Sequence, residues 1–186
     1  NTDWLGIARP IEKRLLAQGR RYPATQLRIL VLGAGGTARA ALYAAEQLGA
    51  VACVYNRTLS KATALAGEFS ACEALSQPSE LSSVPFDVVI STLPPAAHTD
   101  ELAAQLMPVF AVTNERAQHP VFLDVVYYPR PTKLSVAAAA AHCECIDGLE
   151  MVVEQGVWGF ECWTGVRAPV SIMKEAAIEI ATEYTK

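Results

Sequence analysis

Apolar runs alternate with helical patterns along this chain of 186 residues. Runs rich in aliphatic and β-branched residues, typical of buried strands, occur at 27–32, 51–55, 86–92, 120–127 and 143–146. Apolar residues recur at helical spacing at 3–18, 37–48, 60–69, 99–107, 132–141, 149–163 and 171–184. This alternation predicts an α/β fold, a Rossmann-like doubly wound parallel sheet with helices on both faces.

The first helical segment contains Pro10 within its pattern. Proline lacks a backbone N–H and clashes with the preceding turn, so a kink or a later start of this helix is expected. Asn1 or Thr2 has a side chain suited to cap its first turn. We interpret residues 1–22 as an N-terminal linker helix and residues 1–186 as one domain.

The glycine-rich turn Gly33-Ala34-Gly35-Gly36 joins the first strand to a helix that starts near Thr37. Its first glycine permits a tight turn, and the next one lets the backbone approach a pyrophosphate. The following helix N-terminus offers free N–H groups to an anion. We therefore expect Gly33, Ala34, Gly35, Gly36 and Thr37 to bind a dinucleotide, the alternative being a merely tight turn between strand and helix.

Asn56, Arg57 and Thr58 follow the second strand, and Lys61 comes three residues later. NAD-selective sites usually place Asp or Glu here, where it bonds the ribose 2′-hydroxyl. Arg57 can instead grip a 2′-phosphate through its planar fork. These four residues therefore predict a preference for NADP, unless the cations only form a solvated helix start.

The composition excludes several other classes of protein. The net charge is −4, without a basic stripe, which argues against a nucleic-acid partner. No apolar run reaches the roughly 18 residues of a membrane span. Five cysteines, an odd number, suggest reduced thiols in a cytoplasmic protein, and the lone Cys143-x-Cys145 pair does not predict a metal site. His98, His119 and His142 match no motif, and we assign them no role.

Six segments, in order, resemble motifs of the shikimate dehydrogenases. They are Asn1 to Gly6 (N-T-D-x-x-G), Gly33 to Arg39 (G-A-G-G-x-x-R), Asn56 to Lys61 (N-R-T-x-x-K), Asp124 to Pro129 (D-x-x-Y-x-P), Ile146 to Gly156 (I-D-G-x-x-M-x-V-x-Q-G) and Phe160 to Gly165 (F-x-x-W-T-G). The similarity covers the chain from Asn1 to about Pro169. The turn Ser91-Thr92-Leu93-Pro94 departs from many bacterial members, and it is more similar to the shikimate dehydrogenase module of the pentafunctional AROM polypeptide or to the related quinate repressor.

Together with the alternation of strands and helices, the resemblance implies a sheet of six strands. The resemblance also implies reduction of 3-dehydroshikimate to shikimate with NADPH. It makes Asp3 one half of a catalytic Lys–Asp pair that also bonds the substrate, and it assigns Tyr127 and Gln155 to the substrate. Val125 and Gly148 are implied as backbone contacts to the nicotinamide end. Without the resemblance, Asp3 could equally be a helix cap and Tyr127 a core-edge tyrosine. The alternative for Gln155 is an exposed helical amide.

The lysine of that pair has no counterpart here, because the family carries it in a substrate domain upstream of the N-T-D motif. The chain, which begins without Met, therefore looks like part of a longer polypeptide, and we expect it not to turn over substrate alone. Two alternatives stay open. One is a quinate-repressor-like regulator that senses a metabolite without catalysis, and the other is a quinate or shikimate dehydrogenase that uses NAD.

Overall fold

The computed structural model describes residues 1–20, 27–82, 84–111 and 118–183. Within these ranges the chain forms one sheet of six parallel strands, in the order β3-β2-β1-β4-β5-β6. The strands are β1 (Arg28–Leu32), β2 (Val51–Tyr55), β3 (Cys72–Leu75), β4 (Val88–Ser91), β5 (Val121–Asp124) and β6 (Glu144–Ile146). The predicted fold class and strand number are confirmed.

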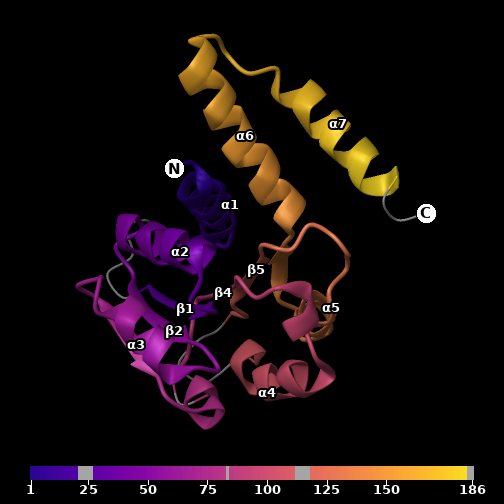
Figure 1. Ribbon diagram of the computed structural model, residues 1–186. Coiled ribbons are helices and arrows are strands. Elements are labelled where there is room, and N and C mark those ends of the chain that lie inside the picture. Colours follow the sequence, from indigo (N-terminus) through magenta and orange to yellow (C-terminus); the bar gives the residue numbers. More distant parts are fainter. Residues whose placement is uncertain (21–26, 83, 112–117, 184–186) are drawn as a thin grey trace.

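Helices connect the strands and extend beyond them at both ends of the described chain (Figure 1). They are α1 (Asp3–Ala17), α2 (Gly36–Gln47), α3 (Leu59–Ala66), α4 (Asp100–Phe110), α5 (Lys133–Ala140), α6 (Gly148–Thr164) and α7 (Val170–Glu183). Two short 3₁₀ turns, η1 (Pro78–Ser82) and η2 (Pro95–Ala97), lie on either side of β4 in the sequence. In the described part of the chain, no helix is long and apolar enough to cross a membrane.

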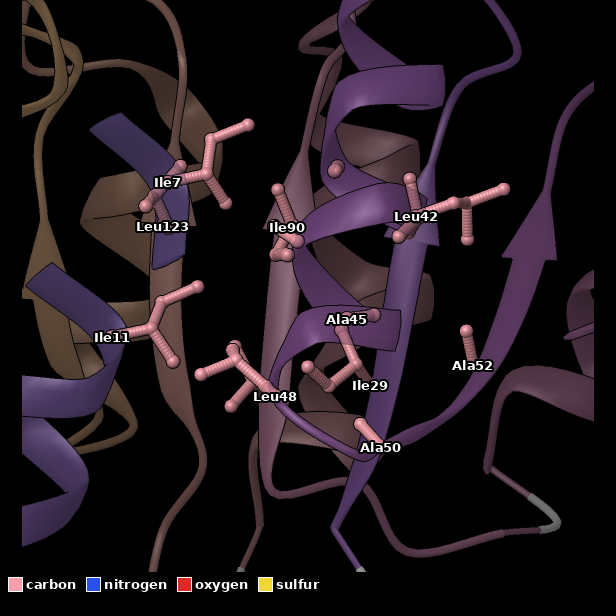
Figure 2. Close-up of a cluster of buried hydrophobic side chains, with 14 of the residues drawn as sticks. Ile7, Ile11, Ile29, Leu42, Ala45, Leu48, Ala50, Ala52, Ile90 and Leu123 are labelled. Atoms are coloured by element: carbon pink, nitrogen blue, oxygen red, sulfur yellow. The ribbon is translucent and has the colours of Figure 1, made fainter. Parts of the chain in front are cut away.

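Successive residues of β1 supply two separate hydrophobic layers. Ile29 and Val31 pack with α1, α2 and α3 on one face of the sheet, whereas Leu30 and Leu32 pack with α4 and α5 on the other. This alternation follows from the two-residue period of a strand, and it buries both faces, as expected for a parallel sheet. Figure 2 shows the first layer, with Ile7, Ile11, Leu42, Ala45 and Leu48 of the helical side over Ile29, Ile90 and Leu123.

α1 begins at Asp3 and continues through Pro10, so the alternative of a late start is wrong. Asn1 Oδ1 accepts a 2.8 Å hydrogen bond from the backbone N–H of Asp3. Proline inside a helix costs about 3 kcal/mol. Ile7 and Ile11 are fully buried on this helix, and burial of each stabilises by about 1.5–3 kcal/mol, which offsets that cost.

β3 is a strand that the apolar pattern did not identify. It is four residues long at the edge of the sheet, and of its side chains only Leu75 is buried. A short edge strand has little apolar surface to cover, so it leaves a weak sequence signal. α4 likewise runs past the predicted end at residue 107 to Phe110, because Val109 and Phe110 are buried in the core.

α6 and α7 form a pair of helices that projects away from the sheet (Figure 1). The turn at Gly165, which has a left-handed φ of 68°, ends α6. Large apolar side chains on this pair are exposed: Trp163, Val166, Val170, Ile172, Ile178 and Ile180.

Candidate functional site

The order of the strands places a crevice between the carboxyl ends of β1 and β4. The chain moves outward from β1 through β2 to β3 and then returns to the other side of β1 with β4. The connections after β1 and β4 therefore leave the sheet toward opposite faces. Doubly wound sheets bind dinucleotides at such a switch point, and the predicted glycine turn follows β1 directly.

The turn after β1 leaves open space where a phosphate would bind. Gly33 has a φ of 110°, a conformation that L side chains rarely adopt, and its N–H donates to Tyr55 O at 2.8 Å. Gly35 is the N-cap of α2 and provides no side-chain cap. A Cβ added to Gly35 or Gly36 would meet nothing within 4 Å. The first N–H groups of α2 thus face an open space beside Ala34 and Thr37 and are available to an anion.

The predicted clamp lies at the end of β2, next to this turn. The Asn56 side-chain amide donates to Thr58 O at 3.0 Å and shapes the connection to α3. Thr58 is the N-cap of α3, but its side chain makes no capping bond. Arg57 and Lys61 are exposed, and among the described residues neither has an ion-pair partner within 4.0 Å. Two unpaired cations beside an open helix terminus suit a second phosphate group.

Arg39, by contrast, is already paired. It lies in the first turn of α2 and contacts the carboxylate of Glu68, which follows α3. This pair joins the first turn of α2 to the residues that follow α3. Both side chains are about half exposed, at 57% and 44%, so the pair contributes little stability by itself.

Val125 and Gly148 lie in direct backbone contact at the carboxyl end of β5. The Val125 N–H donates to Ser91 O at 3.0 Å, which fixes the residue beyond β5 against β4. A Cβ on Gly148 would lie 2.6 Å from the carbonyl carbon of Val126, and closer still to Val125 O. The two residues that the resemblance assigned to the nicotinamide end are therefore brought together by the first turn of α6.

Asp3 and Gln155 belong to helices that pack closely against each other. A Cβ on Gly6 would lie 2.7 Å from Met151 O and 3.2 Å from Gln155 Cβ, so α1 and α6 meet at this glycine. Asp3 lies one turn before Gly6, on the same side of α1. Gln155 Oε1 is enclosed and has no hydrogen-bond partner among the described residues, which leaves it free to accept from a ligand.

Further contacts hold α1 in this orientation. Arg14 donates to Glu150 of α6 at 2.9 Å and binds Glu144 of β6 at 2.9 Å. The guanidinium of Arg9 lies 4.7 Å from the ring centroid of Trp158, within cation–π range.

Tyr127 lies on the connection that follows β5, and 55% of its surface is exposed. Within the described ranges no hydrogen bond joins it to Asp3 or Gln155. The structure thus brings Val125 together with Gly148, and it packs the helix of Asp3 against the helix of Gln155 at Gly6. Tyr127 stays accessible at the same edge of the sheet.

A buried polar cluster was missed by the motif reading. Asp124, the last residue of β5, accepts from Thr132 Oγ1 at 2.5 Å and from Val126 N–H at 3.2 Å. His98 Nδ1 lies 3.5 Å from Asp124 Oδ2, with both side chains 3% exposed. Burial raises the pKa of Asp124 above its ordinary value, although the Thr132 hydrogen bond and His98 oppose the rise. Asp124 begins the D-x-x-Y-x-P motif, which gave it no role, and neither His98 nor Thr132 belongs to a motif.

A cavity of about 600 Å³ opens beside this cluster, between α5 and the start of α6. Asp124 and Val126 line it together with Arg130 and Asp147, which form a 3.0 Å ion pair. All residues that line this cavity lie in β5 or later in the sequence. Because β5 pairs with β4, the cavity lies next to the crevice at β1 and β4 and is separate from it. In the described part of the chain, no group of three or more His, Cys, Asp or Glu residues is placed to hold a metal ion.

Two family models match the chain. One described as "Shikimate / quinate 5-dehydrogenase" matches residues 16–152, and one described as "Shikimate 5'-dehydrogenase C-terminal domain" matches residues 148–178. The first match covers well over half of the 186 residues. The chain therefore belongs to the shikimate/quinate dehydrogenase family, a family of oxidoreductases.

Among its relatives, the chain is similar to a shikimate dehydrogenase (NADP(+)) of Carboxydothermus hydrogenoformans, with 37% identity over 82% of this chain and 55% of the relative. It is also similar to the pentafunctional AROM polypeptide of Schizosaccharomyces pombe, with 36% identity over 96% of this chain and 12% of the relative. The chain thus spans about half the length of the first of these relatives and a small part of the second.

Solved structures give the same picture. The dehydroquinate dehydratase and shikimate dehydrogenase structure from S. pombe AroM superposes with a TM-score of 0.80 at 33% identity, covering 96% of this chain and 34% of that one. A Thermus thermophilus shikimate dehydrogenase in complex with NADP(H) and shikimate has a TM-score of 0.70 at 29% identity, covering 96% and 62%. A Corynebacterium glutamicum quinate dehydrogenase in complex with NAD has a TM-score of 0.75 at 28% identity, with the same coverage.

Proposed function

We propose that this chain is the cofactor-binding part of an NADP-dependent shikimate dehydrogenase, which reduces 3-dehydroshikimate to shikimate. The observation that carries the proposal is an open α2 N-terminus beside two exposed cations, Arg57 and Lys61, that have no ion-pair partner among the described residues. A pyrophosphate fits the α2 N-terminus, and a 2′-phosphate fits the two cations. The relatives named for NADP, and the structure solved with NADP(H) and shikimate, support the same assignment.

The residues of the crevice fit this cofactor. Gly35 and Gly36 border space that a Cβ would occupy, so the backbone can approach the pyrophosphate. Arg57 and Lys61 would hold the 2′-phosphate, while Val125 and Gly148 would present backbone groups to the nicotinamide end. When bound, NADPH supplies a hydride to the substrate carbonyl. The residues of this chain orient the cofactor and exclude water from it.

Asp3 and Gln155 would form the part of the substrate site that this chain supplies. A carboxylate can accept hydrogen bonds from ring hydroxyls and can orient a lysine that delivers the proton. The enclosed Gln155 Oε1 has no partner among the described residues, and a substrate hydroxyl would satisfy it. Tyr127, exposed at the same edge, has a hydroxyl that can donate or accept.

The exposed side of the α6–α7 pair supports an upstream domain in the same polypeptide. Trp163 is 89% exposed and Ile172 64% exposed, which is unusual for a clustered set of large apolar side chains. Since the shikimate dehydrogenase relative is nearly twice as long as the matched region, the domain that carries the catalytic lysine is the proposed occupant of this surface. The chain would then supply one wall of a cleft between two domains.

A titration of the chain with NADP and NAD at one fixed salt concentration tests the cofactor assignment. NADP should bind about tenfold more tightly or better, since a charge-assisted hydrogen bond is worth roughly 1.5–3 kcal/mol. Arg57→Ala should remove most of this preference, and Lys61→Ala part of it. Lys13→Ala, which removes an exposed cation from α1, is the matched control. Equal affinities for NADP and NAD would favour an NAD-dependent quinate dehydrogenase.

An activity assay of a longer polypeptide that includes the upstream domain distinguishes an enzyme from a regulator. An enzyme oxidises shikimate with NADP. A repressor-like regulator would bind shikimate or quinate without turnover, which would contradict the proposed activity while leaving the cofactor site intact.

A further inference from the structure

His98 is a buried histidine to which no motif or proposed step assigns a role. It follows η2 and precedes the Thr99 cap of α4, and it is 6% exposed. Its ring lies between two elements that are far apart in the sequence. Nε2 lies 3.3 Å from Leu93 O, in the connection after β4, and Nδ1 lies 3.5 Å from Asp124 Oδ2 at the end of β5.

Both groups that face the ring are hydrogen-bond acceptors when Asp124 is ionised. The carbonyl of Leu93 can only accept, so Nε2 must carry the proton of this contact. Nδ1 is enclosed and has no hydrogen-bond partner among the described residues, although it lies close to the Asp124 carboxylate.

The segment that His98 holds forms a wall of the crevice. A Cβ on Gly33 would lie 2.5 Å from Thr92 Oγ1 and 3.5 Å from a methyl carbon of Leu93. Thr92 in turn donates through its hydroxyl to Leu32 O at 2.8 Å, which attaches the start of the connection to β1. The connection therefore lies on the glycine turn, and a displacement of Leu93 moves the wall beside it.

Asp124 extends the same support to the other side of the site. Its two oxygens accept from Val126 N–H and from Thr132 Oγ1. These contacts hold the segment that carries Val125 and Tyr127. His98 and Asp124 together thus join the wall over the glycine turn to the segment that faces the substrate.

We propose that His98 is a positioning residue that, through Leu93, holds the 92–97 connection against the glycine turn and, through Asp124, holds the segment that carries Val125 at the proposed nicotinamide end. The role rests on the proposed cofactor site, and it deepens that assignment by naming the residue that sets one wall. The proposed role requires no contact between His98 and the cofactor, because the imidazole is buried behind the 92–97 connection.

The test compares three variants of this chain. His98→Phe keeps a ring but removes both nitrogen contacts. His98→Gln keeps an amide that can donate to Leu93 O or to Asp124. His119→Phe is the matched control: His119 is half-buried, its Nδ1 lies 3.0 Å from Phe110 O, and it precedes β5 at the opposite edge of the sheet.

Two probes separate the halves of the cofactor site. Adenosine 2′-monophosphate carries only the phosphate that the clamp at Arg57 and Lys61 would hold, whereas NADPH also reaches the glycine turn and the nicotinamide end. His98→Phe should weaken NADPH binding roughly three- to tenfold, the range that one lost hydrogen bond produces, while binding of the monophosphate changes less than about twofold. His98→Gln should recover part of the NADPH affinity, and His119→Phe should change neither probe.

Amide hydrogen exchange without any ligand supplies an independent measurement. In His98→Phe, and not in His119→Phe, the amides of Thr92, Leu93 and of residues 125–127 should exchange faster together. If exchange there is unchanged, or if both probes weaken equally, the positioning role is wrong. If the wild-type chain binds neither probe, the proposed cofactor site fails, and the exchange result still decides whether His98 joins the two segments. Should His98→Phe fail to fold, His98→Gln is judged by the same two measurements.

Discussion

Gly148 lies so close to Val125 that any side chain at this position would overlap the Val125 carbonyl. The contact joins the N-terminus of α6 to the segment after β5 without any side chain between them. α6 also carries Gln155, so this approach sets where the proposed substrate residue lies relative to the proposed nicotinamide end.

Gly148→Ala should therefore destabilise the chain and displace α6. An inserted methyl group against backbone costs about 1–3 kcal/mol, because backbone cannot turn aside as a side chain can. Urea unfolding measures the loss. Gly67→Ala is the control, since a Cβ at Gly67 meets its nearest atom at 3.5 Å, an ordinary contact. Equal stability of the two variants would contradict the close approach.

The two ends of the glycine turn should respond differently to alanine. Gly33 has a left-handed φ of 110°, so Gly33→Ala should cost about 1–2 kcal/mol of folding stability. Gly35 has a φ of −98° and open space around it, so Gly35→Ala should fold normally. It should nevertheless weaken NADP binding about tenfold or more, because the new methyl group occupies the space of the pyrophosphate. Thermal unfolding and calorimetric titration of both variants check this, and a stable Gly35→Ala that binds NADP normally would place the pyrophosphate elsewhere.

The chain by itself should oxidise no measurable shikimate with NADP. Holding substrate and cofactor in register can account for roughly 7–11 kcal/mol of a barrier, and one wall of a cleft cannot supply this. Covalent restoration of the upstream domain should recover activity. NADPH absorbance measures that activity. Asp3→Asn in that longer polypeptide should then remove most of it. Robust turnover by the 186-residue chain would show that the base lies elsewhere.

The cysteines should differ widely in reactivity. Burial, and then the neighbouring Cys53 and Glu73, raise the pKa of Cys72 to about 11 from its ordinary 9.0. Burial, and then Cys145, raise the pKa of Cys143 to about 12. At pH 8 only about a thousandth of Cys72 would be thiolate, the reactive form. Cys162 is exposed, so iodoacetamide at pH 8 should label Cys162 first, as read by mass spectrometry of the peptides.

The same raised pKa values predict that the free energy of unfolding falls at alkaline pH. The unfolded chain ionises these thiols near pH 9, whereas the folded chain resists ionisation. Their contribution to folding is therefore complete below pH 9 and is lost as the pH rises toward 11 and 12. Cys143→Ala should flatten this loss. Early labelling of Cys143 at pH 8 would contradict its burial.

Local sequence signals predicted the regular elements well and the irregular contacts poorly. The strands at 27–32 and 51–55 were visible because buried parallel strands are continuous apolar runs. β3 was not, because an edge strand with one buried side chain lacks such a run. The start of α1 at Asp3 was obscured by Pro10, whose local cost is outweighed by the burial of Ile7 and Ile11. Propensity yields to packing wherever a helix has a large apolar face.

By itself, the sequence determined the glycine turn after the first strand, the cations that follow the second strand and the alternation that defines the sheet. Each of these depends on residues that are neighbours in the chain, so spacing is sufficient evidence for them. Only the tertiary structure decided that the helix of Asp3 meets the helix of Gln155 at Gly6, and that His98 lies between Leu93 and Asp124. Those contacts join separate elements, and they depend on how closely two backbones approach and on which polar atoms the core encloses.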